Sequence, residues 1–167
     1  RRKHLSIVHK ANVLKLGDGM FIEMCHAVGR EFPEVQVDDF IVDAMMAHVV
    51  RAPDRFDVIV TTNMFGDILS DLTAELSGSL GLGGSLNAGK HHAMGQAAHG
   101  SAPDIAGKDI ANPFSLILSA AQLLAWHGTR RALPRFGEAA RAIELACEQA
   151  VKAGETTRDV GGRLGTA

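Results

Sequence analysis

Several features that would place this sequence in a simple functional class are scarce or absent. Its 167 residues contain only two cysteines, Cys25 and Cys147, which stand alone without a CxxC motif, so we expect reduced core thiols. No apolar run approaches the roughly 20 residues that a membrane span requires, and no signal-peptide pattern occurs. Basic and acidic side chains nearly balance, 17 against 19, which gives no general attraction to nucleic acid or membrane. We therefore expect a cytoplasmic protein without nucleic-acid or membrane partners.

The apolar content, by contrast, is sufficient for a packed core. Hydrophobic residues make up 46% of the chain, which has the length of a single domain. Short apolar strands alternate with helical patterns: strands are predicted over 5–10, 35–42 and 57–62, and helices over 17–32, 43–53 and 63–79. This alternation predicts an α/β sheet, with site residues gathered at strand ends and helix starts.

The character of the sequence changes after residue 77. Residues 78–113 are rich in Gly, Ala, Ser and His and poor in periodicity, which predicts a long loop without regular structure that is either functional or disordered. Two helices follow, one over 114–128 that is apolar nearly all round and expected to be buried, and one over 136–154. The expected inward stripe of the last helix is Ala139, Ala142, Ile143, Ala146 and Ala150. Because the chain opens on Arg1 and soon enters a strand, we expect it to be the middle of something longer.

An acidic pair follows the strand over 57–62. Asp67 and Asp71 are four positions apart, so both carboxylates project from one face of the predicted helix. Two like charges at that spacing are unfavourable unless a cation lies between them, and oxygen ligands suit Mg²⁺ or Mn²⁺. A bare DxxxD pair is, however, more often a solvated acidic face, with Asp67 stabilising the helix N-terminus.

Three further positions can carry chemistry. Lys10 ends a strand, where it is either a solvated strand end or, beside a metal and a substrate oxygen, an acid–base group. Asp43 directly follows a strand and is equally suited to N-capping the next helix. The segment HGSAPDIAG, residues 99–107, supplies small residues whose backbone amides can approach phosphates, although it is neither GxGxxG nor a Walker loop.

Four segments carry a resemblance to a known family: HKANVLK, VDAMMAHVV, DVIVTTNMFGDILSDLTAELSGSLGLGGS and HGSAPDIAGKDIANP. In this order and spacing they are similar to the C-terminal half of the isocitrate/isopropylmalate dehydrogenase family, the metal-dependent β-decarboxylating dehydrogenases. The resemblance runs from about residue 5 to residue 127, and the last helix and TRDVGG fit loosely. It implies a three-layer α/β fold of isopropylmalate-dehydrogenase type, of which this chain is the C-terminal half. Residues 1–77 would be part of the small metal, substrate and dimerisation domain, and residues 78–167 part of the large cofactor-binding domain.

The resemblance also implies an activity, the NAD-dependent oxidative decarboxylation of a 2-hydroxy diacid with Mg²⁺ or Mn²⁺ as the Lewis acid. Lys10 would be the acid–base group, acting across the interface of a homodimer. Asp67 and Asp71 would bind the metal, and Asp43, the other residue assigned to catalysis, would complete the ligand set from the neighbouring subunit. The implied cofactor contacts are Asn12, His99, Gly100, Ser101, Ala102, Asp104, Ile105 and Asn112.

Cofactor and substrate preferences follow from the same resemblance. Asp104 and Ile105 stand where NADP-using members carry Lys and Tyr, and a carboxylate there would repel a 2′-phosphate, which favours NAD. The segment TTNMFGDILSD is more similar to the isopropylmalate and tartrate branch than to the NADP isocitrate branch. The catalytic tyrosine and the substrate-clamping arginines belong to the family's N-terminal half, and this sequence contains no Tyr. The alternative is a catalytically incomplete fragment, or a regulatory or structural subunit that binds nucleotide or a partner chain.

Overall fold

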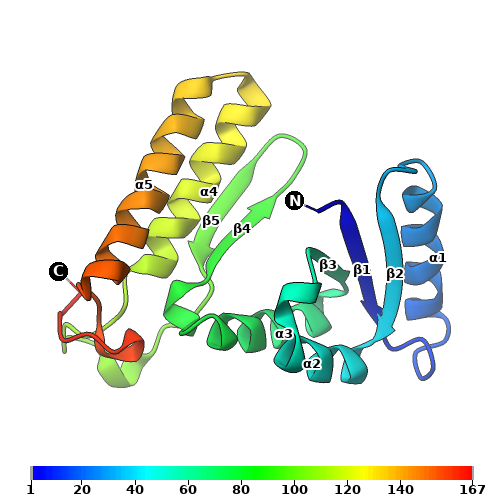
Figure 1. Ribbon diagram of the computed structural model, residues 1–167, viewed down its shortest axis with the longest axis horizontal. Helices are drawn as coiled ribbons and strands as arrows, with labels where there is room; N and C mark the ends of the chain where they lie inside the picture. Colours follow the sequence, from blue (N-terminus) through cyan, green and yellow to red (C-terminus); the bar gives the residue numbers. More distant parts are fainter. Residues whose placement is uncertain (1, 167) are drawn as a thin grey trace. The chain divides into compact units, whose positions relative to one another are not determined.

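The chain divides into two compact units. The computed structural model describes residues 2–166 (Figure 1), and in the sequence the boundary between the units falls between Thr73 and Ala74. Helix α3 (Asn63–Leu76) runs through this boundary. The expected division after residue 77 follows the change in composition, whereas the observed division falls inside a continuous helix.

The first unit is built on a parallel three-stranded sheet. Its strands are β1 (His4–His9), β2 (Gln36–Ile41) and β3 (Val58–Thr61), in the order β2-β1-β3. Helix α1 (Gly17–Gly29) connects β1 to β2, and α2 (Val42–Arg51) followed by the short helix η1 (Pro53–Arg55) connects β2 to β3. Because β1 is central, Ile7 pairs with Asp39 on one side and with Val60 on the other. The strand and helix predictions for this unit are confirmed, and the carboxyl ends of all three strands lie at one edge of the sheet.

The core of this unit lies where the sheet meets α2 and α3. Val8 and Met45 are fully buried, and Val49 and Leu69 are 2% and 4% exposed. These four side chains come from a strand and two helices, so they fix α2 and α3 against β1. Met45 is therefore a core residue of this unit.

Helix α1, unlike α2 and α3, leaves its apolar stripe exposed. Met20, Met24 and Val28 are 65%, 58% and 50% exposed, so the stripe is not buried within the described residues. Met24 and Val28 instead line an apolar cavity of about 710 Å³, together with residues of β1 and β3.

The second unit contains an antiparallel hairpin that the sequence did not indicate. Strands β4 (Gly84–Ala88) and β5 (Ala93–Ala97) pair with Gly84 opposite Ala97, so the prediction of an unstructured loop over 78–113 is wrong for this part. The glycines permit close packing on helix α4 (Phe114–Arg131), because a Cβ on Gly95 would lie 2.8 Å from the Ser119 carbonyl oxygen. A Gly- and Ser-rich composition therefore marks a sheet packed tightly against a helix rather than a loop.

Small polar residues form the buried face of α4. Ser115 and Ser119 are fully buried, whereas Leu116 and Ile117 are 58% and 38% exposed, so the expectation of a helix buried all round is wrong in this chain. Ser119 Oγ accepts a hydrogen bond from Ser85 N–H at 2.9 Å and donates to Gln96 O at 2.6 Å. The hydroxyls therefore satisfy backbone groups of both hairpin strands.

The last helix, α5 (Pro134–Ala153), is antiparallel to α4 and packs beside it (Figure 1). Its buried residues are Ala140 and Cys147, one turn to either side of half-buried Ile143, so the predicted stripe is offset by about one residue. Three short helices complete the unit: η2 (Leu80–Leu82), η3 (Pro103–Ile105) and η4 (Arg158–Val160). Cys25 and Cys147 are both free, but only Cys147 is buried, so the prediction of a core thiol does not hold for half-buried Cys25. Among the described residues, no helix has both the length and the apolar character that a membrane span requires.

Candidate active site

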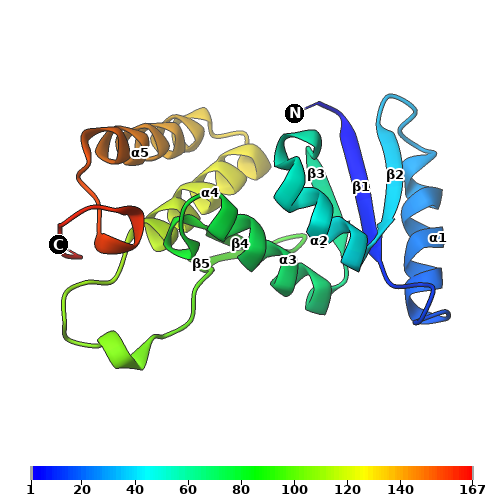
Figure 2. The same cartoon turned by 60° about the horizontal axis from the view of Figure 1, so that its bottom comes forward.

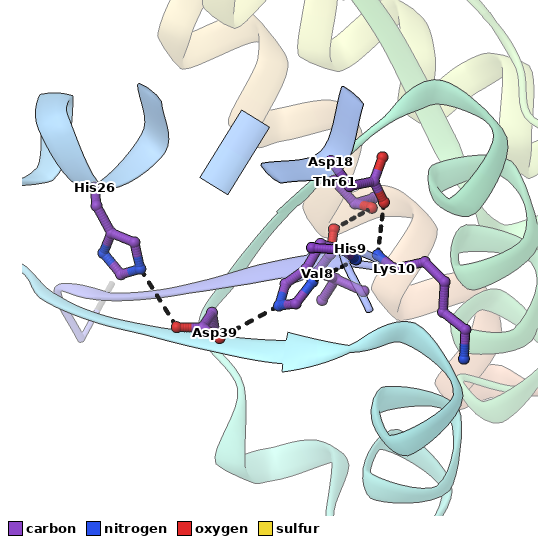
Figure 3. A network of polar contacts seen from close by, with 8 residues as sticks. Val8, His9, Lys10, Asp18, His26, Asp39 and Thr61 are labelled. Carbon is purple, nitrogen blue, oxygen red and sulfur yellow. Dashed lines mark hydrogen bonds and ion pairs between the residues drawn. The ribbon is translucent and has the colours of Figure 1, made fainter. Parts of the chain in front are cut away.

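The turn after β1 holds Lys10 through its backbone. Lys10 N–H donates to the carboxylate of Asp18 at 2.6 Å, and Asp18 is only 5% exposed in the first turn of α1 (Figure 3). Lys10 O accepts from the amides of Val13 and Leu14 at 2.9 and 2.8 Å. The main chain of Lys10 is therefore fixed on both sides, while its side chain remains 26% exposed.

A histidine–aspartate chain lies beneath this turn. His9, 6% exposed, accepts the Ala11 N–H on Nδ1 at 3.1 Å and places Nε2 3.3 Å from Asp39. Because Nδ1 accepts a hydrogen bond, the neutral ring carries its hydrogen on Nε2 and donates that hydrogen to Asp39. His26 Nε2 lies 3.3 Å from the other Asp39 oxygen, as Figure 3 shows. The result is a polar support that joins α1, β1 and β2 directly below Lys10.

The side chain of Lys10 reaches Asp43. Lys10 Nζ donates to Asp43 Oδ1 at 2.5 Å, which brings together the two residues assigned to catalysis. This hydrogen bond, with one from the backbone amide of Asp43 itself, holds the pKa of the Asp43 carboxyl below its ordinary value. Asp43 lies in the first turn of α2, but the N-cap is Ile41, so the alternative of a capping role does not apply.

The acidic pair on α3 lies on an exposed surface. Asp67 and Asp71 are one turn apart, and neither carboxylate receives a hydrogen bond or an ion pair from any residue between 2 and 166. Two unneutralised carboxylates at this spacing are the donor chemistry that a hard divalent cation prefers. Within the described part of the chain, no group of three or more His, Cys, Asp or Glu side chains could hold a metal. Because the predicted third ligand, Asp43, is expected from a neighbouring subunit, the ligand set stays a prediction.

The predicted cofactor loop surrounds a cavity of about 870 Å³ in the second unit. Most of the predicted contacts line it, namely His99, Gly100, Ser101, Ala102, Ile105 and Asn112. Its volume lies in the range of small-molecule and cofactor sites, about 300–1,000 Å³. Ala102 adopts a left-handed backbone, φ 42°, immediately before η3, and conformations of this kind persist where surrounding structure holds a binding loop in place. Figure 2 shows this connection between β5 and α4.

Two predicted contacts lie elsewhere. Asp104 is exposed on η3 and is not among the residues that line the cavity. Asn12 belongs to the first unit, two residues after Lys10, and is exposed. Their roles toward a cofactor stay predictions.

Asp159 also lines the cavity, and the sequence did not single it out. Its carboxylate accepts hydrogen bonds from Ser79 Oγ at 2.5 Å, Thr157 Oγ1 at 2.5 Å and Asn112 Nδ2 at 2.9 Å. Partial burial alone would raise the pKa of Asp159, but these hydrogen bonds to its charged form outweigh burial and hold the pKa below the ordinary value.

Sequence reasoning therefore missed Asp18, His9 and Asp159. Asp18 had one usable signal, because an acidic residue at the start of a predicted helix faces the orphan N–H groups there. Asp159 had no local signal, since its partners Ser79 and Asn112 are 80 and 47 positions away.

Comparison with known proteins decides the family. The profile described as isocitrate/isopropylmalate dehydrogenase matches residues 1–167. The chain belongs to the isocitrate/isopropylmalate dehydrogenase family. Members of this family are decarboxylating dehydrogenases that use NAD(P) and a divalent metal.

Individual relatives have different names. The chain is 47% identical over 165 residues to a 3-isopropylmalate dehydrogenase of Archaeoglobus fulgidus, covering 99% of this chain and 48% of the relative. It is 43% identical over 159 residues to an isocitrate dehydrogenase [NADP] of Rickettsia felis, covering 95% and 32%. The crystal structure of isocitrate dehydrogenase from Methylococcus capsulatus superposes with a TM-score of 0.92 at 46% identity, covering 100% of this chain and 48% of that one.

These matches confirm the predicted family and the α/β fold. The chain spans about half the length of the Archaeoglobus fulgidus relative and of the solved structure. Dehydrogenases named for isopropylmalate and for isocitrate are both similar to it, and one of them is named for NADP, so family membership leaves substrate and cofactor preference open.

Proposed function

We propose that this chain forms the C-terminal half of an NAD-dependent dehydrogenase that oxidises and decarboxylates a 2-hydroxy diacid. The observation that carries the proposal is the cavity formed by His99, Gly100, Ser101, Ala102, Ile105 and Asn112 in a chain that matches this dehydrogenase family from residue 1 to residue 167. In this proposal the cavity binds the adenosine half of the dinucleotide. The exposed Asp104 accepts ribose hydroxyls and repels a 2′-phosphate, which favours NAD over NADP.

The residues of the first unit would perform the chemistry. When bound, a divalent cation supplies Lewis-acid polarisation and the nicotinamide supplies a hydride acceptor. Asp67 and Asp71 would hold the cation with Asp43 of a neighbouring subunit, and the two free carboxylates on α3 fit that role. This arrangement requires a homodimer. A cytoplasmic location is proposed with it.

Lys10 would move the proton. Oxidation transfers a hydride from C2 of the substrate to NAD⁺ and a proton from its hydroxyl to a base, and loss of CO₂ leaves a carbanion that takes one proton back. The net products are a 2-oxo acid, CO₂ and NADH. This role is supported by the hydrogen bonds of the Asp18 carboxylate and His9 to the turn of Lys10, and by a side chain that remains 26% exposed.

A turnover assay tests the proposal. The purified chain, alone and co-expressed with the N-terminal half of the Archaeoglobus fulgidus relative, is mixed with Mn²⁺, NAD⁺ and isopropylmalate, isocitrate, homoisocitrate, malate or tartrate. NADH absorbance is expected to rise with one substrate. Lys10→Ala should abolish the rise, whereas Lys3→Ala, an exposed lysine before β1, should leave it unchanged. Full turnover by the Lys10 variant would contradict the proposed role.

The alternative is a structural or regulatory chain that does not bind metal. A chain of this kind would also show no cluster of three metal-ligating side chains, as is the case within residues 2–166. Calorimetric titration with Mn²⁺ separates the two functions. The dehydrogenase proposal expects binding that Asp71→Asn weakens and that Glu75→Gln, one turn further along α3, leaves intact. A chain that never binds Mn²⁺, with or without the co-expressed half, would support the structural alternative.

A further inference from the structure

The Asp159 carboxylate connects three polar side chains at the proposed cofactor cavity. Asp159 Oδ2 accepts hydrogen bonds from Ser79 Oγ and Asn112 Nδ2, and Oδ1 accepts from Thr157 Oγ1. Ser79 and Thr157 are only 6% and 4% exposed. Two buried hydroxyls therefore fix the carboxylate, and the carboxylate in turn fixes Asn112.

The Asn112 amide is held at both of its ends. Its Nδ2 donates to Asp159 at 2.9 Å, and its Oδ1 accepts the N–H of Phe114 at 2.9 Å. Turning the amide over would place an N–H against the Phe114 N–H and an oxygen against the Asp159 carboxylate. The amide therefore keeps one orientation, which leaves one N–H and one oxygen lone pair in a fixed order for a ligand.

The backbone of Gly81 packs closely against both Asn112 and Asp159. A Cβ on Gly81 would lie 2.8 Å from Asn112 Nδ2 and 2.8 Å from Asp159 Oδ2. Gly81 N–H also donates to Ser79 Oγ at 3.0 Å. The backbone of η2 therefore lies directly against the Asn112–Asp159 pair on the side of Gly81.

We propose that Asp159 is a positioning residue that locks the Asn112 amide and thereby selects a 6-aminopurine over a 6-oxopurine in this cavity. The inference rests on the proposed cofactor function. Adenine presents an N–H donor at its 6-amino group beside the acceptor N1, whereas hypoxanthine presents an acceptor oxygen beside an N1–H donor. A locked amide matches one pattern and opposes the other, whereas a free amide turns over to match either.

The test compares two dinucleotides that differ only in this base. Isothermal titration calorimetry measures the Kd of NAD⁺ and of nicotinamide hypoxanthine dinucleotide for the full chain. The wild type is expected to bind NAD⁺ about tenfold more tightly, the effect of one mismatched hydrogen-bonding pair. Asp159→Asn should reduce this ratio to about twofold or less, because the released Asn112 amide accommodates both bases.

Asp109→Asn is the matched control. Asp109 lines the same cavity, but its carboxylate bonds the Thr166 N–H at 3.2 Å and does not contact Asn112. This variant removes a comparable charge and should retain the tenfold ratio. A ratio that falls equally in both variants would assign the effect to charge and overturn the positioning role.

The remaining outcomes distinguish a failure of the Asp159 positioning role from a failure of the proposed cofactor site. A wild type that binds both dinucleotides equally, or a folded Asp159→Asn variant with an unchanged ratio, overturns the inference and leaves the cofactor site in place. A wild type that binds neither dinucleotide overturns both. If circular dichroism shows that Asp159→Asn does not fold, Ser79→Ala decides, because it withdraws one hydroxyl from the same carboxylate oxygen. A lowered ratio then supports the lock, and an unchanged ratio overturns it.

Discussion

Removing the carboxylate of Asp18 should loosen the turn that carries Lys10. Asp18 is 5% exposed and accepts the Lys10 N–H at 2.6 Å, so Asp18→Ala removes a buried hydrogen bond to a charged group, a loss of about 1.5–3 kcal/mol. It also removes the acidic residue from the first turn of α1, which adds roughly 0.3–1 kcal/mol. The free energy of unfolding should therefore fall by about 2–4 kcal/mol. Asp18→Asn keeps an acceptor oxygen and should lose about half of this.

Two measurements check this prediction at different scales. Urea denaturation followed by circular dichroism gives the change in unfolding free energy. Amide hydrogen exchange reports locally, and the Lys10 amide should exchange faster in Asp18→Ala by a factor of at least about 10, since each 1.4 kcal/mol is tenfold. Glu23→Ala is the control, an exposed carboxylate on the same helix. Unchanged exchange at Lys10 in Asp18→Ala would refute the argument even if global stability fell.

Three further predictions concern packing and charge. Gly95→Ala should destabilise the chain by about 1–3 kcal/mol, because its Cβ would meet the Ser119 carbonyl, whereas Gly137→Ala in α5 meets nothing within 4 Å and should stabilise it by up to about 1 kcal/mol. Ser119→Ala should cost about 1–3 kcal/mol in denaturant melts, because the Ser85 N–H loses its acceptor. Lys10→Met should return the lowered pKa of Asp43 toward its ordinary value near 3.8, as seen by carboxyl ¹³C NMR. The sign follows from linkage: the depressed pKa adds stability above about pH 4, and this contribution is lost as pH falls through the folded-state pKa.

Each of these predictions has an opposing result. Equal melting temperatures for Gly95→Ala and the wild type would show that the hairpin and α4 do not pack as closely as described. A neutral Ser119→Ala would mean that water replaces the hydroxyl. An Asp43 pKa that does not move in Lys10→Met would assign its depression to the backbone amide of Asp43 alone.

Local periodicity predicted the first unit well. Its strands are short β-branched runs such as residues 5–8, and its helices begin directly after them, so each element has a signal within its own ten residues. The sequence also indicated that Lys10 and Asp43 lie close together. Each of them follows a strand, and the carboxyl ends of parallel strands meet at one edge of a sheet.

The second unit was harder to predict because its stability depends on distant contacts. The β4–β5 hairpin lacks alternating apolar residues, and its backbone is satisfied by hydroxyls of Ser115 and Ser119 on a helix that begins seventeen residues after β5. The same holds for Asp159, whose role appears only when Ser79 and Asn112 are brought beside it. Single-sequence patterns carry no record of such pairings.

The central place of β1 has a consequence for synthesis of the chain. Leu5 pairs with Val37 and also with Val58, so one edge of the strand nearest the N-terminus remains unpaired until 53 further residues exist. At ribosomal rates of about 5–20 residues per second, that interval lasts roughly 3–10 seconds. During this time the edge of β1 that will pair with β3 has no partner from that strand, and an unpaired strand edge is a site that chaperones and other nascent strands can bind. The strand that leads into the Lys10 turn can pair on both of its edges only after Thr61 has left the exit tunnel.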